Sequence, residues 1–317
     1  MISFRYHIVS IVSVFLALAI GVALGGGPLK GEVDNTLVEQ VEADRKAKAA
    51  FQADIAALNS SNDFTDEFAA NVAPGLLTKR LAGRPVTLVV LPGADEKVVA
   101  SVTELVGVAG GTIGGTVRAG DELVDAGNKQ LVDELGSQLL DGTPDVTVAD
   151  DASGYERMGA LIARAVATDE DGGAAVDDAA NSILSGLSTA NLMSAEGDFA
   201  TRGSLVLFVA GPGTGSEEAR QGANTIVTSL ASAIDADTDG VVVAGPVSAA
   251  RGNGLISAVR GDVAAARDIS TVDVVGREAG QVVTVMALAE QAQGATGHYG
   301  AVDAANGAMP GAAVPSD

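Results

Sequence analysis

The run Val86-Thr-Leu-Val-Val-Leu-Pro-Gly93 decides the fold class, because a continuous apolar segment ends directly on a turn. Strands that are buried on both faces have such uninterrupted runs, and this pattern is typical of parallel sheets. Asp95 follows the turn, and its short polar side chain favours the start of a helix that continues to about Val108. The segment therefore predicts a strand followed by a helix, the unit from which α/β domains are built.

The same alternation of strands and helices continues along the rest of the chain. We expect strands at 112–117, 146–148, 204–209, 241–244 and 269–274, and helices at 121–140, 155–168, 176–187, 216–234, 255–259 and 279–293. This order predicts a doubly wound, mostly parallel α/β sheet. We place this domain at residues 74–300. The Gly-, Ala- and Pro-rich residues 301–317 have no periodicity and are predicted to be a disordered tail.

An uncharged stretch, Ile8–Leu29, precedes this domain. About 20 apolar residues in a helix cross the ~30 Å hydrocarbon layer of a bilayer. With Arg5 before it and Lys30 after it, the pattern predicts that residues 1–29 form an uncleaved signal anchor. The short N-terminus then lies in the cytoplasm and the body outside it, in a single-pass membrane protein. The alternative is a cleaved secretory signal with Ala23-Leu24-Gly25 as its cleavage site, which also places the body outside.

Small residues recur on one face of this stretch. Ala17, Gly21 and Gly25 are four residues apart, so a helix places them along one side. Small residues at this spacing let two membrane helices approach closely, which predicts self-association within the lipid bilayer. The alternative is that the glycines from Gly25 onward only end the span.

Residues 30–73 are predicted to form a helical stalk. Apolar residues recur at helical spacing at Val33, Leu37, Val41, Phe51, Ile55 and Leu58. A charged run in the middle leaves only a thin apolar seam, so this segment is either a short coiled coil or a helix packed along its own domain. Pro74 is expected to end the helix, and a second short helix is expected at 76–81.

Composition disfavours several classes of function. The 317 residues include 19 Lys and Arg against 41 Asp and Glu, a net charge of −22, which repels nucleic acids. Cysteine is absent and the histidines are His7 and His298, so neither thiolate sites nor a multi-histidine metal centre can come from one chain. The five methionines are not clustered as Cu(I) ligands would be. The residues therefore predict no metal site and no cofactor.

A glycine loop, Gly211-Pro-Gly-Thr-Gly-Ser216, stands between a predicted strand and a predicted helix. Such loops can hold a phosphate at the amino end of a helix. This one lacks the Lys of a P-loop, and Glu217 and Glu218 would repel a phosphate. We interpret it as a tight turn, with Ser216 as the cap of the helix that follows.

Polar residues also lie near the end of the last long strand. Ser270, Thr271 and Asp273 could coordinate or hydrogen-bond a ligand, because α/β sheets bind ligands near strand ends. The alternative for Asp273 is a helix cap or turn anchor. His298 and Tyr299 follow the last helix, and we expect His298 to pack against the body. No nucleophile–base or acid–base pair is apparent, so no catalytic residue is proposed.

Four parts of the chain together resemble a known family. They are MISFRYHIVSIVSVFLALAIGVALGGGPL at residues 1–29, RLAGRPVTLVVLPG at 80–93, ISTVD at 269–273 with AGQ at 279–281, and GHYG at 297–300. In order and spacing they resemble the actinobacterial copper-transport protein B (MctB) family over residues 1–300. The resemblance implies a membrane-anchored envelope protein in copper efflux. For related members it also implies a partner role with a neighbouring membrane protein in controlling cell-wall hydrolysis.

Copper thus enters only through the resemblance, because the residues themselves show no copper ligands. Two functions follow as expectations. The first is a component of copper efflux and homeostasis in the cell envelope. The second is a non-catalytic envelope scaffold that acts through a protein partner.

Overall fold

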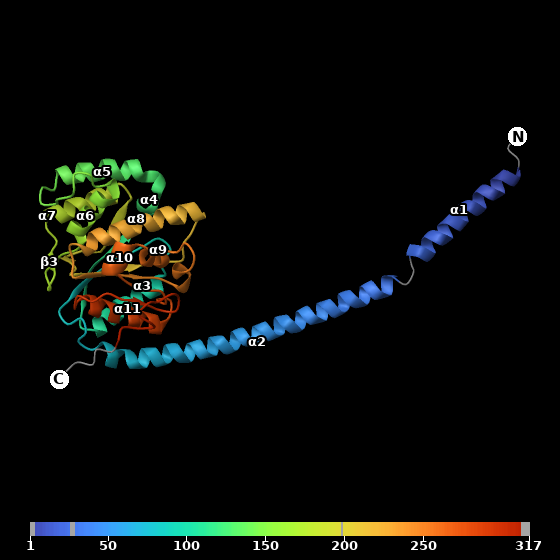
Figure 1. Ribbon diagram of the computed structural model, residues 1–317, viewed down its shortest axis with the longest axis horizontal. Coiled ribbons are helices and arrows are strands. Elements are labelled where there is room, and N and C mark those ends of the chain that lie inside the picture. Colours follow the sequence, from blue (N-terminus) through green and yellow to red (C-terminus); the bar gives the residue numbers. More distant parts are fainter. Residues whose placement is uncertain (1–3, 26–28, 198, 312–317) are drawn as a thin grey trace. The chain divides into compact units, whose positions relative to one another are not determined.

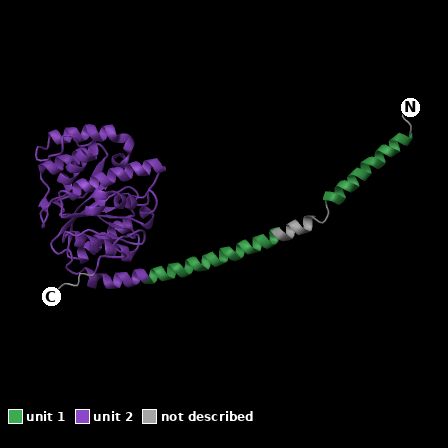
Figure 2. Ribbon diagram, viewed as in Figure 1, with its two compact units in different colours: residues 1–64 green, residues 65–317 purple. Residues whose placement is uncertain are grey.

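The structure, a computed structural model, describes residues 4–25, 29–197 and 199–311. The chain divides into two compact units, residues 1–64 and residues 65–317 (Figure 2). The first unit holds helix α1, Phe4–Gly25, and most of helix α2, Leu29–Leu77. The last turns of α2 and the whole sheet belong to the second unit.

Helix α1 has the length and composition of a membrane span. Its 22 residues are strongly apolar, and none of them is buried within the chain. Among the described residues it is the one helix long and apolar enough to cross a bilayer.

Helix α2 is longer than expected. Pro74 lies inside it, so the prediction that this proline ends the helix is wrong, and turns replace the short helix expected at 76–81. Ala73 and Leu77, on either side of Pro74, are buried in the core of the second unit. Their burial holds the last turn in helical form although the proline cannot donate a backbone hydrogen bond.

The main sheet has seven strands in the order β4-β2-β1-β6-β7-β8-β9. The strands are β1 Pro85–Val90, β2 Thr112–Ala119, β4 Met193–Glu196, β6 Leu205–Val209, β7 Gly240–Ala244, β8 Ser270–Val272 and β9 His298–Tyr299. All neighbours pair in parallel except β4, which runs antiparallel to β2. The predicted α/β class and mostly parallel sheet are therefore confirmed. Strands β3, Ala174–Ala175, and β5, Thr201–Arg202, form a separate small ladder.

Helices alternate with these strands (Figure 1). They are α3 Glu96–Val108, α4 Asp121–Val124, α5 Lys129–Asp141, α6 Gly154–Val166, α7 Asp178–Thr189, α8 Glu217–Asp235, α9 Leu255–Gly261, α10 Val263–Asp268 and α11 Glu278–Gln291. Two caps lie where the sequence predicts them: Asp95 accepts a bond from the Lys97 backbone N–H, and Ser216 accepts one from that of Ala219.

Two local expectations are wrong. The helix expected at 121–140 is broken, because Asp125 caps a short 3-10 turn, Ala126–Asn128, before α5 begins. The edge strand expected at 146–148 is absent from the described chain. Strand β4, which lacks a clear sequence pattern, pairs with the outer side of β2 instead and occupies that edge of the sheet.

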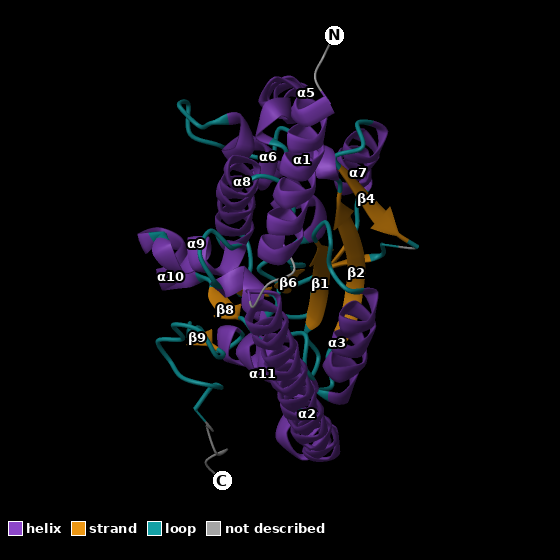
Figure 3. Cartoon of the chain, turned by 90° about the vertical axis from the view of Figure 1, so that its right-hand side faces the viewer, coloured by secondary structure: helices purple, strands orange, loops and turns teal. Residues whose placement is uncertain are grey.

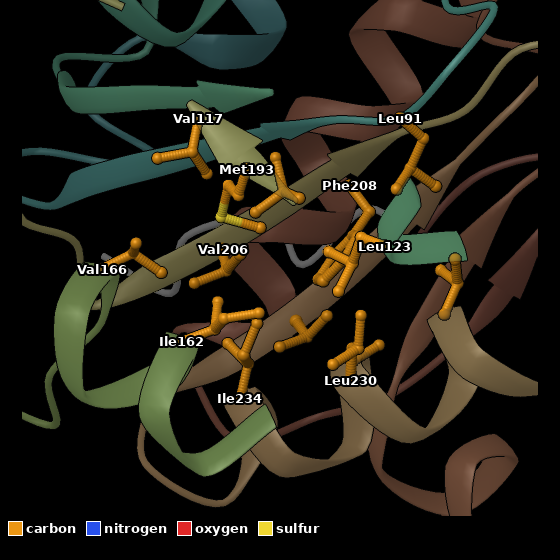
Figure 4. Close-up of a cluster of buried hydrophobic side chains, with 14 of the residues drawn as sticks. Leu91, Val117, Leu123, Ile162, Val166, Met193, Val206, Phe208, Leu230 and Ile234 are labelled. Carbon is orange, nitrogen blue, oxygen red and sulfur yellow. The ribbon is translucent and has the colours of Figure 1, made fainter. Parts of the chain in front are cut away.

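The strands separate two hydrophobic cores. Val86, Leu88 and Val90 of β1 face the core shared with α3, α11 and the end of α2. Val206 and Phe208 of β6 face the opposite core, which α6 and α8 cover (Figures 3 and 4). Both faces of the sheet are therefore covered by helices, which explains why its central strands are apolar without alternation.

The order of the strands reverses beside β1. From β1 the chain moves to β2 and β4 on one side, then returns to β6 on the other side and continues outward to β9. β1 and β6 are neighbouring parallel strands, so their carboxyl ends meet at the same edge. Open α/β sheets bind ligands at this kind of position.

Candidate functional site

The loops that follow β1 and β6 touch through two glycines. A Cβ on Gly211 would lie 2.0 Å from the carbonyl oxygen of Gly93, so only glycine permits this approach. Gly93 also has a φ of +78°, a backbone conformation that favours glycine. The two glycines therefore hold the loops together where the strand order reverses.

A cavity of about 110 Å³ opens at this edge of the sheet. Its walls come from the ends of β1 and β6 and from α4, α8 and α9. The larger aliphatic side chains that line it are Leu91, Val124, Val227 and Leu255. The glycine loop, which we interpret as a turn, forms one border through Gly211 and Gly213. Much of the cavity surface is therefore apolar.

Four polar side chains line the same cavity: Asp121, Thr214, Arg220 and Asn224. Asn224 donates to the backbone oxygen of Asn253 at 2.9 Å, so its amide is held in place. The Nε atom of Arg220 is buried and has no hydrogen-bond partner among the described residues. Asp121, the first residue of α4, is exposed. The cavity therefore combines an apolar interior with one cation and one anion.

The residues singled out near the end of the last strand form a second polar cluster, at the β8–β9 side of the sheet. The Ser270 hydroxyl is buried and accepts bonds from Gln291 Nε2 at 2.9 Å and from the Gly297 backbone N–H at 3.0 Å. This hydroxyl therefore joins the end of α11 to the chain that enters β9.

Thr271 and His298 are hydrogen-bonded neighbours. His298 Nε2 lies 3.0 Å from the Ala266 carbonyl oxygen, which can only accept, so Nε2 carries the proton. Nδ1 then accepts from the Thr271 hydroxyl at 3.0 Å, and that hydroxyl accepts from Arg260 Nε at 2.8 Å. Burial lowers the pKa of His298, and the nearby Arg260 charge lowers it further. The imidazole is therefore neutral and fully engaged.

Asp273 has no exposed surface. Its Oδ2 atom accepts from Arg260 Nη1 at 2.9 Å, and its Oδ1 atom accepts from the Ala301 backbone N–H at 2.7 Å. Gly300 makes this possible, because a Cβ there would lie 2.1 Å from Asp273 Oδ1. The carboxylate therefore anchors the turn that follows β9 and leaves no oxygen open to a ligand.

Tyr299 lies buried in the same cluster, and its hydroxyl donates to Glu290 Oε2. Burial, together with this hydrogen bond, raises the pKa of the Tyr299 hydroxyl. Backbone bonds also tie the following residues to β9, since Asn306 N–H donates to the His298 oxygen. Part of the segment expected to be a tail is thus hydrogen-bonded to the sheet, whereas residues 312–317 lie outside the described residues.

Sequence reasoning missed two residues of this cluster, Arg260 and Gln291. Arg260 also donates to the backbone oxygens of Tyr299 and Val302. Gln291 is buried near the end of α11, a helix whose other residues are mostly apolar. A polar residue in such an apolar helix could have predicted that Gln291 takes part in a polar cluster, because buried amides need hydrogen-bond partners. For Arg260 the sequence offers no comparable signal.

Neither cluster resembles a metal centre. Within the described parts of the chain, no three His, Asp or Glu side chains gather where they could hold a metal ion. Met158 and Met286 are buried in α6 and α11 among apolar neighbours. Their thioether side chains therefore pack in the two hydrophobic cores.

The small residues of the span lie in α1 as expected. Ala17, Gly21 and Gly25 share this one helix, and a Cβ added at either glycine would meet nothing within 4 Å. Their surface is thus available to lipid or to another helix.

An apolar N-terminal helix followed by a long helix and a mostly parallel α/β domain defines a class of membrane-associated proteins with one candidate span. A family model described as "Copper transport outer membrane protein, MctB" matches residues 1–310, so the chain belongs to the MctB family. The chain is similar to "Copper transporter MctB" of Mycobacterium tuberculosis, with 28% identity over 95% of this chain and 96% of the relative. It is 29% identical to the Mycobacterium leprae protein of the same name, over 95% and 96% of the two chains.

Proposed function

We propose that this protein is a single-span, membrane-anchored component of copper efflux in the cell envelope. The match to the MctB family over residues 1–310 carries this proposal. Helix α1 supplies the anchor, and the acidic α/β domain lies outside the cytoplasm. On this proposal the protein is not an enzyme.

The protein acts in copper handling without a tight copper site of its own. Cu(I) prefers thiolate and thioether ligands, and this chain has no Cys and only isolated methionines. The polar groups of the second cluster, around Asp273 and Arg260, form hydrogen bonds with one another. Copper is therefore cargo of a process in which the protein takes part, and its ligands lie on other molecules.

A competition titration with a Cu(I) chelator tests whether the chain itself binds Cu(I) tightly. The purified full-length chain in detergent should bind Cu(I) with a dissociation constant no lower than about micromolar. One tight site per chain would overturn the proposal that the ligands lie elsewhere.

A deletion strain tests the role itself. Loss of the gene should increase sensitivity to copper, and the wild-type gene should restore tolerance. Unchanged copper tolerance together with defective cell separation would instead favour the envelope scaffold that the resemblance also implies. Self-association through α1 belongs to this proposal and is tested separately below.

A further inference from the structure

The geometry points to the cavity between the ends of β1 and β6 as a binding site for a small zwitterion of the α-amino acid class. This assignment goes beyond the proposed role in copper handling. The cavity lies where the strand order reverses, the usual ligand position in open α/β sheets. Gly211, which touches the Gly93 loop, lines this cavity.

Arg220 provides the group that binds a carboxylate. Its Nε atom is buried without a hydrogen-bond partner among the described residues, although an unpaired buried donor costs free energy. Gly213 leaves room for this side chain, because a Cβ at Gly213 would lie only 3.0 Å from Arg220 Cδ. Arg220 lines the cavity, and the terminal N–H groups of a planar guanidinium there match a carboxylate.

Asp121 provides the complementary group at the exposed side of the cavity. Neither Asp121 nor Arg220 belongs to an ion pair between described residues, although both line this cavity. A ligand with one positive and one negative group satisfies both. The carboxylate binds inward at Arg220, and the ammonium binds at Asp121.

Size and charge narrow the ligand further. A cavity of about 110 Å³ is well below the ~300–1,000 Å³ of sites for drug-sized ligands, so the ligand has few heavy atoms. Glu217 and Glu218 in the first turn of α8 disfavour a dianion such as phosphate. The apolar side chains Leu91 and Val227 fit a short aliphatic group. A small aliphatic amino acid meets all three conditions.

Calorimetric or NMR titration of the full-length chain in detergent tests the assignment. The probes are L-alanine, D-alanine, propionate and n-propylamine. Saturable binding of either alanine is expected, with propionate and propylamine each weaker by about tenfold or more, because each analogue leaves one charged group of the site unpaired. Binding of neither alanine, or binding of propionate as tight as alanine, would overturn the assignment.

Matched variants test the residues. Arg220→Gln should weaken alanine binding by about tenfold or more, whereas Arg267→Gln, on an exposed arginine of α10, should not change it. Gly213→Ala should also weaken binding because it displaces Arg220, and Gly261→Ala, where a Cβ meets nothing within 4 Å, is its control. Circular dichroism checks that each variant is folded. Wild-type affinity in folded Arg220→Gln would refute the role of Arg220.

Discussion

A single buried carboxylate organises the carboxyl-terminal part of the domain. Asp273 accepts bonds from Arg260 and from the backbone N–H groups of Ala301 and Val302, which are about 30 residues away in sequence. Because the group has no exposed surface, its charge relies on these partners rather than on water. Asp273 is therefore one of the groups that hold the start of the segment after β9, together with Arg260 and the backbone bond between Asn306 and His298.

Removing that charge should destabilise the domain. Asp273→Asn leaves Arg260 buried and uncompensated, so we expect the unfolding free energy to fall by about 3–5 kcal/mol. The measurement is denaturant unfolding of the full-length chain in detergent. Asp268→Asn is the control, because Asp268 pairs with Arg267 at the surface and its loss should change the unfolding free energy little. An equal decrease in unfolding free energy in both variants would show that the buried Asp273–Arg260 pair stabilises the domain no more than a surface pair does.

The ionised carboxylate of Asp235, unlike that of Asp273, lowers the stability of the folded domain. Burial, with the nearby charge of Asp268, raises the pKa of its carboxyl group from 3.8 to about 6. A raised pKa in the folded state means that stability is lost as pH rises from about 4 to about 6, and stays lower above that range.

Asp235→Asn should therefore stabilise the protein at pH 7, by roughly 1–3 kcal/mol. The amide oxygen can still accept from the Val241 backbone N–H, as Asp235 Oδ1 does at 3.2 Å. Melting temperatures at pH 4 and pH 7 measure the effect, with Asp63→Asn on α2 as the control. A stabilisation that is as large at pH 4 as at pH 7 would contradict the electrostatic cause.

At the scale of single elements, α1 and α2 differ in what covers their apolar side chains. In α2, Ala73 and Leu77 pack into the domain, whereas Phe51, Ile55 and Leu58 are exposed. Helix α1 buries no residue within the chain, as expected for a helix whose apolar side chains face lipid. The exposed stripe of α2 is compatible with the predicted seam, and a coiled coil stays a prediction.

The small residues of α1 carry the predicted self-association. Replacing Gly21 and Gly25 together by Leu should reduce cross-linking in membranes, because the side chains hold two helices apart while insertion survives. Replacing Ala19 and Ala23 by Leu is the matched control, since these residues are also four apart and lie on the opposite face. Unchanged cross-linking in the glycine variant would assign any association to the α/β domain.

At the scale of the whole molecule, one candidate span precedes a strongly acidic domain. The position of Arg5 before the span favours a domain outside the cytoplasm. On this basis we predict that the short N-terminus lies in the cytoplasm.

This topology predicts the behaviour of a reporter fused after Asp317. An enzyme that is active only outside the cytoplasm should be active there, and a reporter that works only in the cytoplasm should be silent. The fusion point lies beyond Ala301 and Val302, so it leaves the bonds to Asp273 intact. Activity of the cytoplasmic reporter would contradict the topology.

Local patterns in the sequence determined the apolar helix at residues 4–25, the central strands and the caps at Asp95 and Ser216. Each of these depends on residues close together in the chain: a continuous apolar run, or a side chain that bonds a nearby backbone N–H. Such signals need no knowledge of the rest of the molecule.

Tertiary structure alone decided the remaining features. Strand β4 is short and mostly exposed, and exists because β2 offers it a partner. Helix α2 continues through Pro74 because the core holds its last turn. Arg260 meets Asp273, and Arg220 shares a cavity with Asp121, only after the strands are ordered. These contacts join residues far apart in sequence, so no local pattern could encode them.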